Sequence, residues 1–377
     1  FSHQKHYRKS FFNDENKNCN CILHNKNTNK SLTVFNEAIE RIIKENKDEL
    51  ILSDIIFPDN FEYQSVFSKH TNIQFIDCEF NKKMIHLNIE SICYTQCHFK
   101  NNIWFFDKKD ISKTDNIYNL CFDYCTFEEE FNCDFYADNM PRCNITALNI
   151  QNSTFKKSIK FNKCNINSSY MFSNNTIFGT SDFEDITFKE AYFIRNKFND
   201  VVSFKQSYFD SFTFKENTFD KLAIFEDTTF KSKLNLKGNI FKDEINFLGI
   251  KNENGKSLET ANIVNRETAR IIKHSFEKLD NIIEANKFYA LEMQKREEEV
   301  SKEKNWLDLI VFKFHKISSN HSQDWLLSLL WVINLTFVYT SFQFIEALDS
   351  HWLFLYSFLS IGLIITSIVG LAYLEIP

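Results

Sequence analysis

The amino-acid sequence predicts a mainly β protein in which a four-sided β-helix is followed by one long α-helix and a transmembrane hairpin of two helices. Three observations lead to this prediction. A large apolar residue returns every five or six positions through most of residues 71–250. A highly charged stretch without Gly or Pro follows, over residues 257–304. Two long uncharged runs then occupy most of residues 325–374.

The five-residue period is neither the 3.6-residue period of an amphipathic helix nor the two-residue period of a strand. It is typical of a solenoid in which two of every five side chains point inward and three point outward. In the second half of the repeats the large residues are Phe178, Phe183, Phe188, Phe193, Phe198, Phe204, Phe209, Phe214, Phe219, Phe225, Phe230, Leu236, Phe241 and Phe247.

Four such steps make one coil, and the coils predict two ladders. The first face of each coil centres on Phe80, Phe99, Phe127, Phe155, Phe178, Phe198, Phe219 and Phe241, of which the last four lie 20, 21 and 22 residues apart. Two positions earlier stand Cys78, Cys97, Cys125, Ser153, Thr176, Asn196, Asn217 and Asn239. We expect the stacked Asn amides to hydrogen-bond from coil to coil, because buried polar groups need partners.

This pattern resembles the pentapeptide-repeat family, whose repeat has Leu or Phe at its centre and a small residue two positions earlier. The resemblance covers about half of the chain, residues 71–250. It implies a right-handed quadrilateral β-helix with a ladder of Phe rings at its centre. About eight coils, spaced by roughly 4.8 Å, would form a rod about 40 Å long.

Residues 1–70 are expected to cap the first coil, since an uncovered coil edge can pair with other chains. Residues 1–32 are polar and irregular, and the run Leu50 to Phe57 is typical of a strand. A short amphipathic helix is predicted over residues 33–47 from the spacing of Phe35, Ala38, Ile39, Ile42 and Ile43.

Residues 257–304 are predicted to form one linking helix with a single apolar seam. The seam consists of Ile272, Phe276, Leu279, Ile283, Ala290 and Met293. The run from Glu284 to Met293 resembles the helix that follows the repeats in membrane-attached bacterial members of the family. Residues 305–324 are expected to form a juxtamembrane segment.

The runs Trp325 to Ile345 and Trp352 to Leu374 contain 21 and 23 residues, and about 20 suffice to cross a bilayer. Four lysines precede the first run, whereas residues 346–351 between the runs contain no Lys or Arg. The positive-inside rule therefore predicts a multi-pass protein of the inner (cytoplasmic) membrane with its β-helix in the cytoplasm. Gly362, Thr366 and Gly370 recur at four-residue intervals, which is typical of a helix-packing face.

No nucleophile elbow, HExxH motif or phosphate-binding loop is present, so we predict neither an enzyme nor a cofactor. Five of the ten cysteines, Cys78, Cys97, Cys125, Cys143 and Cys164, fall at inward positions, where a thiol acts as a small hydrophobe. The pairs Cys93/Cys97 and Cys121/Cys125 lack the spacing of a metal site. The cluster Cys19, Cys21 and His24 has no evident fourth ligand. We therefore predict no metal and no disulfide.

Three functional hypotheses follow. The favoured one is a non-catalytic, membrane-tethered cytoplasmic scaffold that binds a protein partner through its β-helix. The second is a subunit of a homo-oligomeric channel or pore with the β-helix as sensor. The third is a DNA mimic that binds gyrase, as some soluble family members do. Residues 71–250 carry 24 acidic and 21 basic residues, and this weak charge imbalance disfavours a DNA-like field. No nucleic-acid partner is expected.

The predicted partner site is a corner at which two adjacent coils are both interrupted, since loops clustered on one side of a solenoid often bind partners. The first interruption supplies Lys108, Lys109, Asp110 and Lys113, and the second supplies Tyr136, Asp138, Met140 and Arg142. The alternative is that a solenoid tolerates loops at any corner.

Overall fold

The computed structural model describes residues 21–26, 28–45, 49–67, 70–85, 89–104, 116–134, 142–259, 262–303, 306–322 and 324–344. The chain divides into two compact units, Phe1–Leu258 and Glu259–Pro377.

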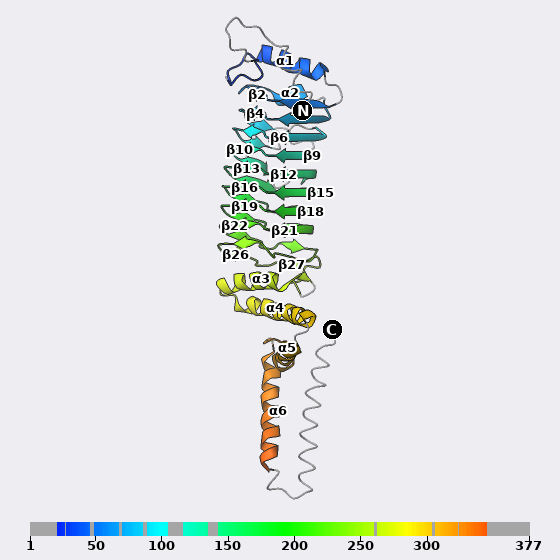
Figure 1. The fold of residues 1–377 in the computed structure, drawn as a ribbon, viewed down its shortest axis with the longest axis vertical. Coiled ribbons are helices and arrows are strands. Elements are labelled where there is room, and N and C mark those ends of the chain that lie inside the picture. Colours follow the sequence, from blue (N-terminus) through cyan, green and yellow to red (C-terminus); the bar gives the residue numbers. More distant parts are fainter. Residues whose placement is uncertain are drawn as a thin grey trace. The chain divides into compact units, whose positions relative to one another are not determined.

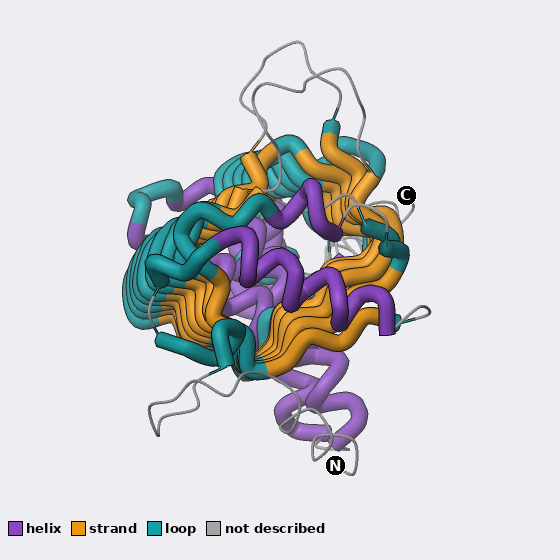
Figure 2. Tube along the Cα trace, turned by 90° about the horizontal axis from the view of Figure 1, so that it is seen from above, coloured by secondary structure: helices purple, strands orange, loops and turns teal. Residues whose placement is uncertain are grey.

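The first unit is a parallel β-solenoid of about 8 turns, consistent with a pentapeptide-repeat fold (Figure 1). Its described residues form three parallel sheets of ten, nine and eight strands. Viewed from above, the strands of successive coils lie over one another (Figure 2).

The bounds of the strands are as follows. The ten-stranded sheet contains β1 (Leu50–Ser53), β3 (Asn72–Ile76), β6 (Ser91–Thr95), β9 (Asn116–Asp123), β12 (Cys143–Gln151), β15 (Cys164–Ser173), β18 (Thr187–Ile194), β21 (Tyr208–Lys215), β24 (Thr229–Phe230) and β27 (Lys251–Asn252). The nine-stranded sheet contains β2 (Ile56–Phe57), β4 (Glu79–Phe80), β7 (His98–Phe99), β10 (Thr126–Phe127), β13 (Thr154–Phe155), β16 (Thr176–Ile177), β19 (Lys197–Phe198), β22 (Thr218–Phe219) and β25 (Ile240–Phe241). The eight-stranded sheet contains β5 (Met84–Ile85), β8 (Ile103–Trp104), β11 (Phe131–Asp134), β14 (Ile159–Asn162), β17 (Ser181–Asp182), β20 (Val202–Ser203), β23 (Ala223–Ile224) and β26 (Ile245–Asn246).

The longest strands cover two of the four predicted faces, which is why four repeats per coil form three sheets. In β18, Phe188 and Phe193 are buried, while Lys189 and Glu190 between them are exposed. The register with neighbouring strands shifts in the middle of β12 and β15. A bend inside one continuous strand therefore replaces the corner between the third and fourth faces.

Stacked aromatic rings fill the core, as the repeat predicts. Along the nine-stranded sheet, Phe99 and Phe127 stack with centroids 5.0 Å apart, and Phe127 and Phe155 with centroids 4.4 Å apart. The first-face prediction is wrong at one coil: Ile177 pairs with Phe155 and is buried, whereas Phe178 is 55% exposed. The register shifts with it, so that Asn175 rather than Thr176 stands in the polar ladder.

The predicted Asn ladder is present and has four members. Side-chain amides of Asn175, Asn196, Asn217 and Asn239 bond head to tail at 3.1, 3.0 and 2.9 Å. The carboxamide oxygens of Asn196, Asn217 and Asn239 each accept from both the backbone and the side-chain amide of the preceding member. The ladder thus satisfies buried groups that would otherwise be costly.

In the later coils, from Lys163 onward, two corners are formed by residues in the left-handed backbone conformation. One column directly follows the strands of the ten-stranded sheet and includes Tyr124 and Arg195, with φ of 53° and 55°. The other precedes these strands and includes Asp185 and Asp227, with φ of 51° and 55°. Gly249, with φ of 69°, continues the second column. At most of these corners the residue is not Gly, so its left-handed backbone conformation is energetically unfavourable.

A helix covers aromatic residues near the first coil, in agreement with the predicted cap. Helix α1 (Leu32–Glu45) buries Phe35, whose ring lies 5.9 Å from Phe57 and 5.3 Å from Phe61. The predicted strand over residues 50–57 is divided into β1 and β2 by Asp54, which has φ of 58°. A short helix α2 (Tyr63–Phe67) follows and was not predicted.

The second unit contains α3 (Arg266–Lys278), α4 (Ile282–Glu303), α5 (Trp306–Ser319) and α6 (Trp325–Phe344). The prediction of one continuous helix over residues 257–304 is wrong, because α3 and α4 form a hairpin at Leu279–Asn281. Asp280 adopts φ of 53°, and the side chain of Asn281 accepts a hydrogen bond from the backbone of Glu284. Of the predicted seam, Ile272 and Phe276 are buried, whereas Ile283 is 75% exposed.

Among the residues that the structure describes, no helix is both long and apolar enough to cross a membrane. The predicted first span coincides with α6, so that prediction has no support from the described helices. The second predicted span, residues 352–374, lies outside the described residues.

Candidate functional site

The outer surface of one part of the ten-stranded sheet, strands β3 to β15, has few charged side chains. Strands β3, β6, β9, β12 and β15 each place three side chains outward, in register. We call these fifteen side chains the broad face, and among them Asp123 is the one charged residue. The broad face consists of Asn72, Gln74, Ile76, Ser91, Cys93, Thr95, Asn119, Cys121, Asp123, Ala147, Asn149, Gln151, Ser169, Met171 and Ser173.

Ion pairs between coils lie on the surface near the nine-stranded sheet. Glu128 contacts His98 at 2.8 Å in the coil before it and Lys156 at 2.8 Å in the coil after it. These hydrogen bonds, led by that from Lys156, lower the pKa of Glu128 below its usual value. Lys242 and Asp220 form a similar pair at 2.7 Å. On this side the charges largely compensate one another within the solenoid.

Two thiols lie next to each other on the broad face. Cys93 in β6 and Cys121 in β9 are register partners in adjacent coils, and both are half-buried. The Cys93 Sγ atom lies 3.9 Å from Thr95 Oγ1. A hydrogen bond with Cys121 is the main cause that lowers the pKa of Cys93 to about 7. The same interaction raises the pKa of Cys121.

The sequence analysis missed this pair, although a signal was present. Cys93 stands between the inward residues Ile92 and Tyr94, and Cys121 stands between Leu120 and Phe122. The two short runs therefore occupy the same place in two coils, and matching them would have predicted the contact.

The predicted inward cysteines behave as small hydrophobes where the structure describes them. Cys78, Cys97, Cys125 and Cys164 are at most 1% exposed. Burial raises the pKa of the Cys97 thiol well above its ordinary value. Cys133 is buried as well, and its Sγ atom lies 3.8 Å from that of Cys164. The side chain of Cys143 lies outside the described residues.

Most residues of the predicted partner corner fall outside the described part of the chain, namely Lys108, Lys109, Asp110, Lys113, Tyr136, Asp138 and Met140. Arg142 is described, and its guanidinium binds its own solenoid. It donates to the Asp185 backbone carbonyl at 3.0 Å and pairs with the Asp185 carboxylate. The predicted packing residues Gly362, Thr366 and Gly370 also lie outside the described residues.

The polar head contains a Cys–His contact. A hydrogen bond between the His24 ring and the Cys21 sulfur raises the pKa of His24. Burial would raise the pKa of Cys21, but its contacts with His24 and the backbone outweigh burial and lower it. Cys19 lies outside the described residues. Where the structure describes the chain, no group of three or more His, Cys, Asp or Glu side chains could hold a metal ion.

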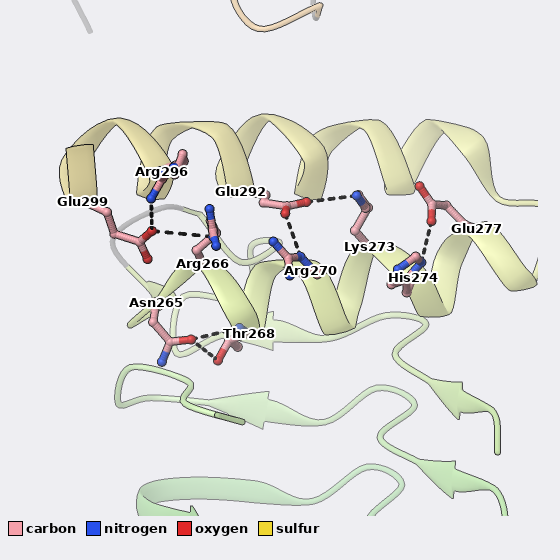
Figure 3. A network of polar contacts seen from close by, with 10 residues as sticks. All are labelled: Asn265, Arg266, Thr268, Arg270, Lys273, His274, Glu277, Glu292, Arg296 and Glu299. Carbon is pink, nitrogen blue, oxygen red and sulfur yellow. Dashed lines mark hydrogen bonds and ion pairs between the residues drawn. The ribbon is translucent and has the colours of Figure 1, made fainter. Parts of the chain in front are cut away.

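The α3–α4 hairpin contains the most deeply buried ion-pair network of the second unit (Figure 3). The Glu292 carboxylate, 6% exposed, accepts from Arg270 Nε and Lys273 Nζ, each at 2.9 Å. Burial alone would raise the pKa of Glu292, but these two hydrogen bonds outweigh burial and lower it. Since Glu292 is in α4 and both cations are in α3, the network fixes the two helices against each other.

Helices α5 and α6 have many exposed large apolar side chains. The exposed residues include Trp306, Leu307, Val311, Phe314, Trp325, Leu326, Val332, Ile333, Leu335 and Tyr339. Helix α6 contains no charged residue. Ser328 Oγ donates to Ser318 O at 3.1 Å and Trp331 Nε1 to Ile317 O at 3.0 Å, so α6 is hydrogen-bonded to the end of α5.

Comparison with family models, with curated proteins and with solved structures finds no match to this chain.

Proposed function

We propose that this chain is a non-catalytic, membrane-tethered scaffold whose solenoid binds a protein partner through the broad face. The observation that carries the proposal is the composition of that face, in which one of fifteen outward side chains is charged. The cores of protein–protein interfaces are depleted in charged residues, because a charge that loses its water needs a partner. A regular parallel sheet also holds these side chains rigidly, which lowers the entropy cost of binding.

The exposed apolar surface of α5 and α6 supports membrane attachment. Trp306, Phe314 and Trp325 are each more than 60% exposed, and large exposed apolar surfaces mark interaction sites for proteins or membranes. Lipid is the favoured partner in this proposal because α6 has no charged residue along its 20 residues. In the scaffold hypothesis, this unit anchors the chain and the solenoid presents the broad face to the cytoplasm.

The partner site is tested with two variants in the same coil. Asn149→Glu places a charge in the middle of the broad face, and Thr154→Glu places the same charge on the nine-stranded sheet. Affinity capture with the full-length chain should lose its specific partner in the first variant and retain it in the second. Equal capture by both variants would show that the broad face is not the binding surface.

Membrane attachment is tested by flotation of the full-length chain with phospholipid vesicles. We expect the wild-type chain to float and the double variant Val332→Glu, Ile333→Glu to remain largely in the dense fraction, with Thr154→Glu as the matched surface control. A wild-type chain that stays in the dense fraction would contradict the attachment. The channel hypothesis stays a prediction, and reproducible single-channel currents from the same vesicles would favour it.

A further inference from the structure

We propose that Cys93 and Cys121 form a modification site, at which exchange with a low-molecular-weight disulfide links two adjacent coils of the solenoid through a new disulfide bond. This inference does not depend on the proposed scaffold function. It rests on the register of two strands, on the accessibility of two thiols and on an internal comparison with a second, buried pair.

The register places the two residues within reach of each other. Cys93 and Cys121 are direct Cα partners on the parallel strands β6 and β9. Neighbouring strands lie about 4.8 Å apart, and disulfides join Cα atoms separated by about 4.4–6.8 Å. Inward residues flank both cysteines, and successive side chains alternate along a strand, so both thiols point to the same outer side.

The surroundings suit thiol–disulfide exchange. Both thiols are half-buried rather than enclosed, so a small disulfide can approach them. The pKa of Cys93, lowered to about 7, makes about half of this thiol a thiolate at neutral pH, and a thiol whose pKa is near the ambient pH attacks disulfides most efficiently. The negative charge of Asp123 opposes the lowering of the Cys93 pKa, and it adds to the rise of the Cys121 pKa.

The reaction needs one equivalent of a small disulfide. The Cys93 thiolate attacks one sulfur of the reagent, whose S–S bond breaks and releases the first thiolate. In this mixed disulfide Cys93 is no longer a thiolate, so the interaction that raised the pKa of Cys121 is lost; the Cys121 thiol gives up its proton, attacks the Cys93 sulfur and releases the second thiolate. Two protein thiols are oxidised to one disulfide, the reagent is reduced to two thiols, and the two cysteine protons pass to the released thiolates.

The buried pair provides the comparison. Cys133 and Cys164 have sulfur atoms 3.8 Å apart, yet both side chains are 0% exposed. Proximity is therefore shared by the two pairs and accessibility is not. If accessibility decides the outcome, a small disulfide oxidises Cys93 and Cys121 and leaves Cys133 and Cys164 reduced.

The test treats the folded full-length chain with excess oxidised glutathione, blocks the remaining thiols with N-ethylmaleimide and maps disulfides by peptide mass spectrometry. We expect a Cys93–Cys121 linkage in most molecules, its reversal by dithiothreitol, and its absence from Cys93→Ser and Cys121→Ser. Cys133→Ser should leave it unchanged. Should these variants misfold, alkylation of the wild-type chain supplies a second measurement, in which Cys93 should react at least about tenfold faster than Cys133.

Three results would overturn the proposal. Cys93 and Cys121 could both remain reduced in the folded chain. Glutathione could stay attached to Cys93 without formation of the linkage, which would show that Cys121 is out of reach. The linkage could also form only after unfolding in guanidinium chloride, which would show that the register plays no part.

Discussion

The Asn ladder makes a quantitative prediction at Asn217, which is 0% exposed. Its side chain makes four hydrogen bonds. It donates to the Phe193 carbonyl at 2.7 Å and to Asn239 Oδ1 at 2.9 Å. It accepts from the backbone and side-chain amides of Asn196, both at 3.0 Å. Asn217→Ala removes all four bonds, and the backbone amide of Asn196 loses its acceptor inside the core.

A buried hydrogen bond contributes about 1 kcal/mol net, and a buried group left without a partner costs about 1–3 kcal/mol. Four lost bonds therefore lower the free energy of unfolding by about 4 kcal/mol. Asn217→Ser should lose about half as much, because a hydroxyl can replace part of the amide. Ser153 occupies the equivalent place three coils earlier in the ladder, and its Oγ accepts from the Cys125 amide at 3.0 Å.

The assay is urea unfolding of the full-length chain followed by circular dichroism, together with hydrogen exchange of the peptide that contains Asn196. The control is Thr218→Ala, which changes the next residue, the half-buried first residue of β22, and should cost less than about 1 kcal/mol. A loss below about 1 kcal/mol for Asn217→Ala, with unchanged protection of the Asn196 amide, would refute the reasoning. Such a result would mean that the Asn side chains fill space in the core and that their hydrogen bonds add little to stability.

Three further predictions concern single positions. Glu292→Gln should destabilise the helical hairpin, because Arg270 and Lys273 lose their buried carboxylate partner. The expected loss is only about 1–2 kcal/mol, because Arg270 is half-exposed and solvent screens its charge. The folded pKa of Glu292 is lowered, so its contribution is present above the unfolded value of 4.5 and is lost as the pH falls through the folded pKa; acid titration of the variant by circular dichroism should lack this loss. Gly179→Ala should cost about 1–3 kcal/mol in urea unfolding, because the new Cβ would lie 2.5 Å from the Lys157 carbonyl carbon. Asn265→Ala removes the N-cap of α3, whose side chain accepts a backbone hydrogen bond at 2.9 Å, and should cost about 1 kcal/mol. Asn265→Asp should restore most of this loss, measured as thermal unfolding at 222 nm.

The sequence predicts the solenoid because the spacing of the large apolar residues recurs in successive coils. That spacing does not decide which of two adjacent apolar residues faces the core. Ile177 and Phe178 are both apolar, and counting back five residues from Phe183 selects the wrong one. The other coils contain a six-residue step at this corner, as from Phe198 to Phe204, and that step would have selected Ile177. Physically, either side chain can fill a core position, so the hydrogen-bond register decides.

The helical unit illustrates a different limit. An apolar seam can continue through a turn, because Leu279 and Ile283 preserve the spacing of the helix although both are exposed in the hairpin. The stop signal is local: Asp280 and Asn281 are residue types that favour left-handed turns and helix caps. Periodicity averaged over many residues conceals such a signal.

The candidate site was less predictable than the fold. The contact of Cys93 with Cys121 joins residues separated by 28 positions, and an interruption between them hides the coil length. Inward positions follow from apolar periodicity, whereas outward contacts depend on which coil pairs with which. The composition of the broad face became apparent only after the strands were aligned in register.

The left-handed corners have a consequence for how such a chain can change in length. Each corner residue costs about 1–2 kcal/mol as soon as its own coil forms, whereas ring stacks and amide bonds arise only between coils. A single coil is therefore unfavourable, and several must assemble before the stack is stable. An insertion or deletion that is not a whole coil would also move every later corner residue out of its column. We expect viable length variants, whether produced by recombination or by engineering, to gain or lose entire coils.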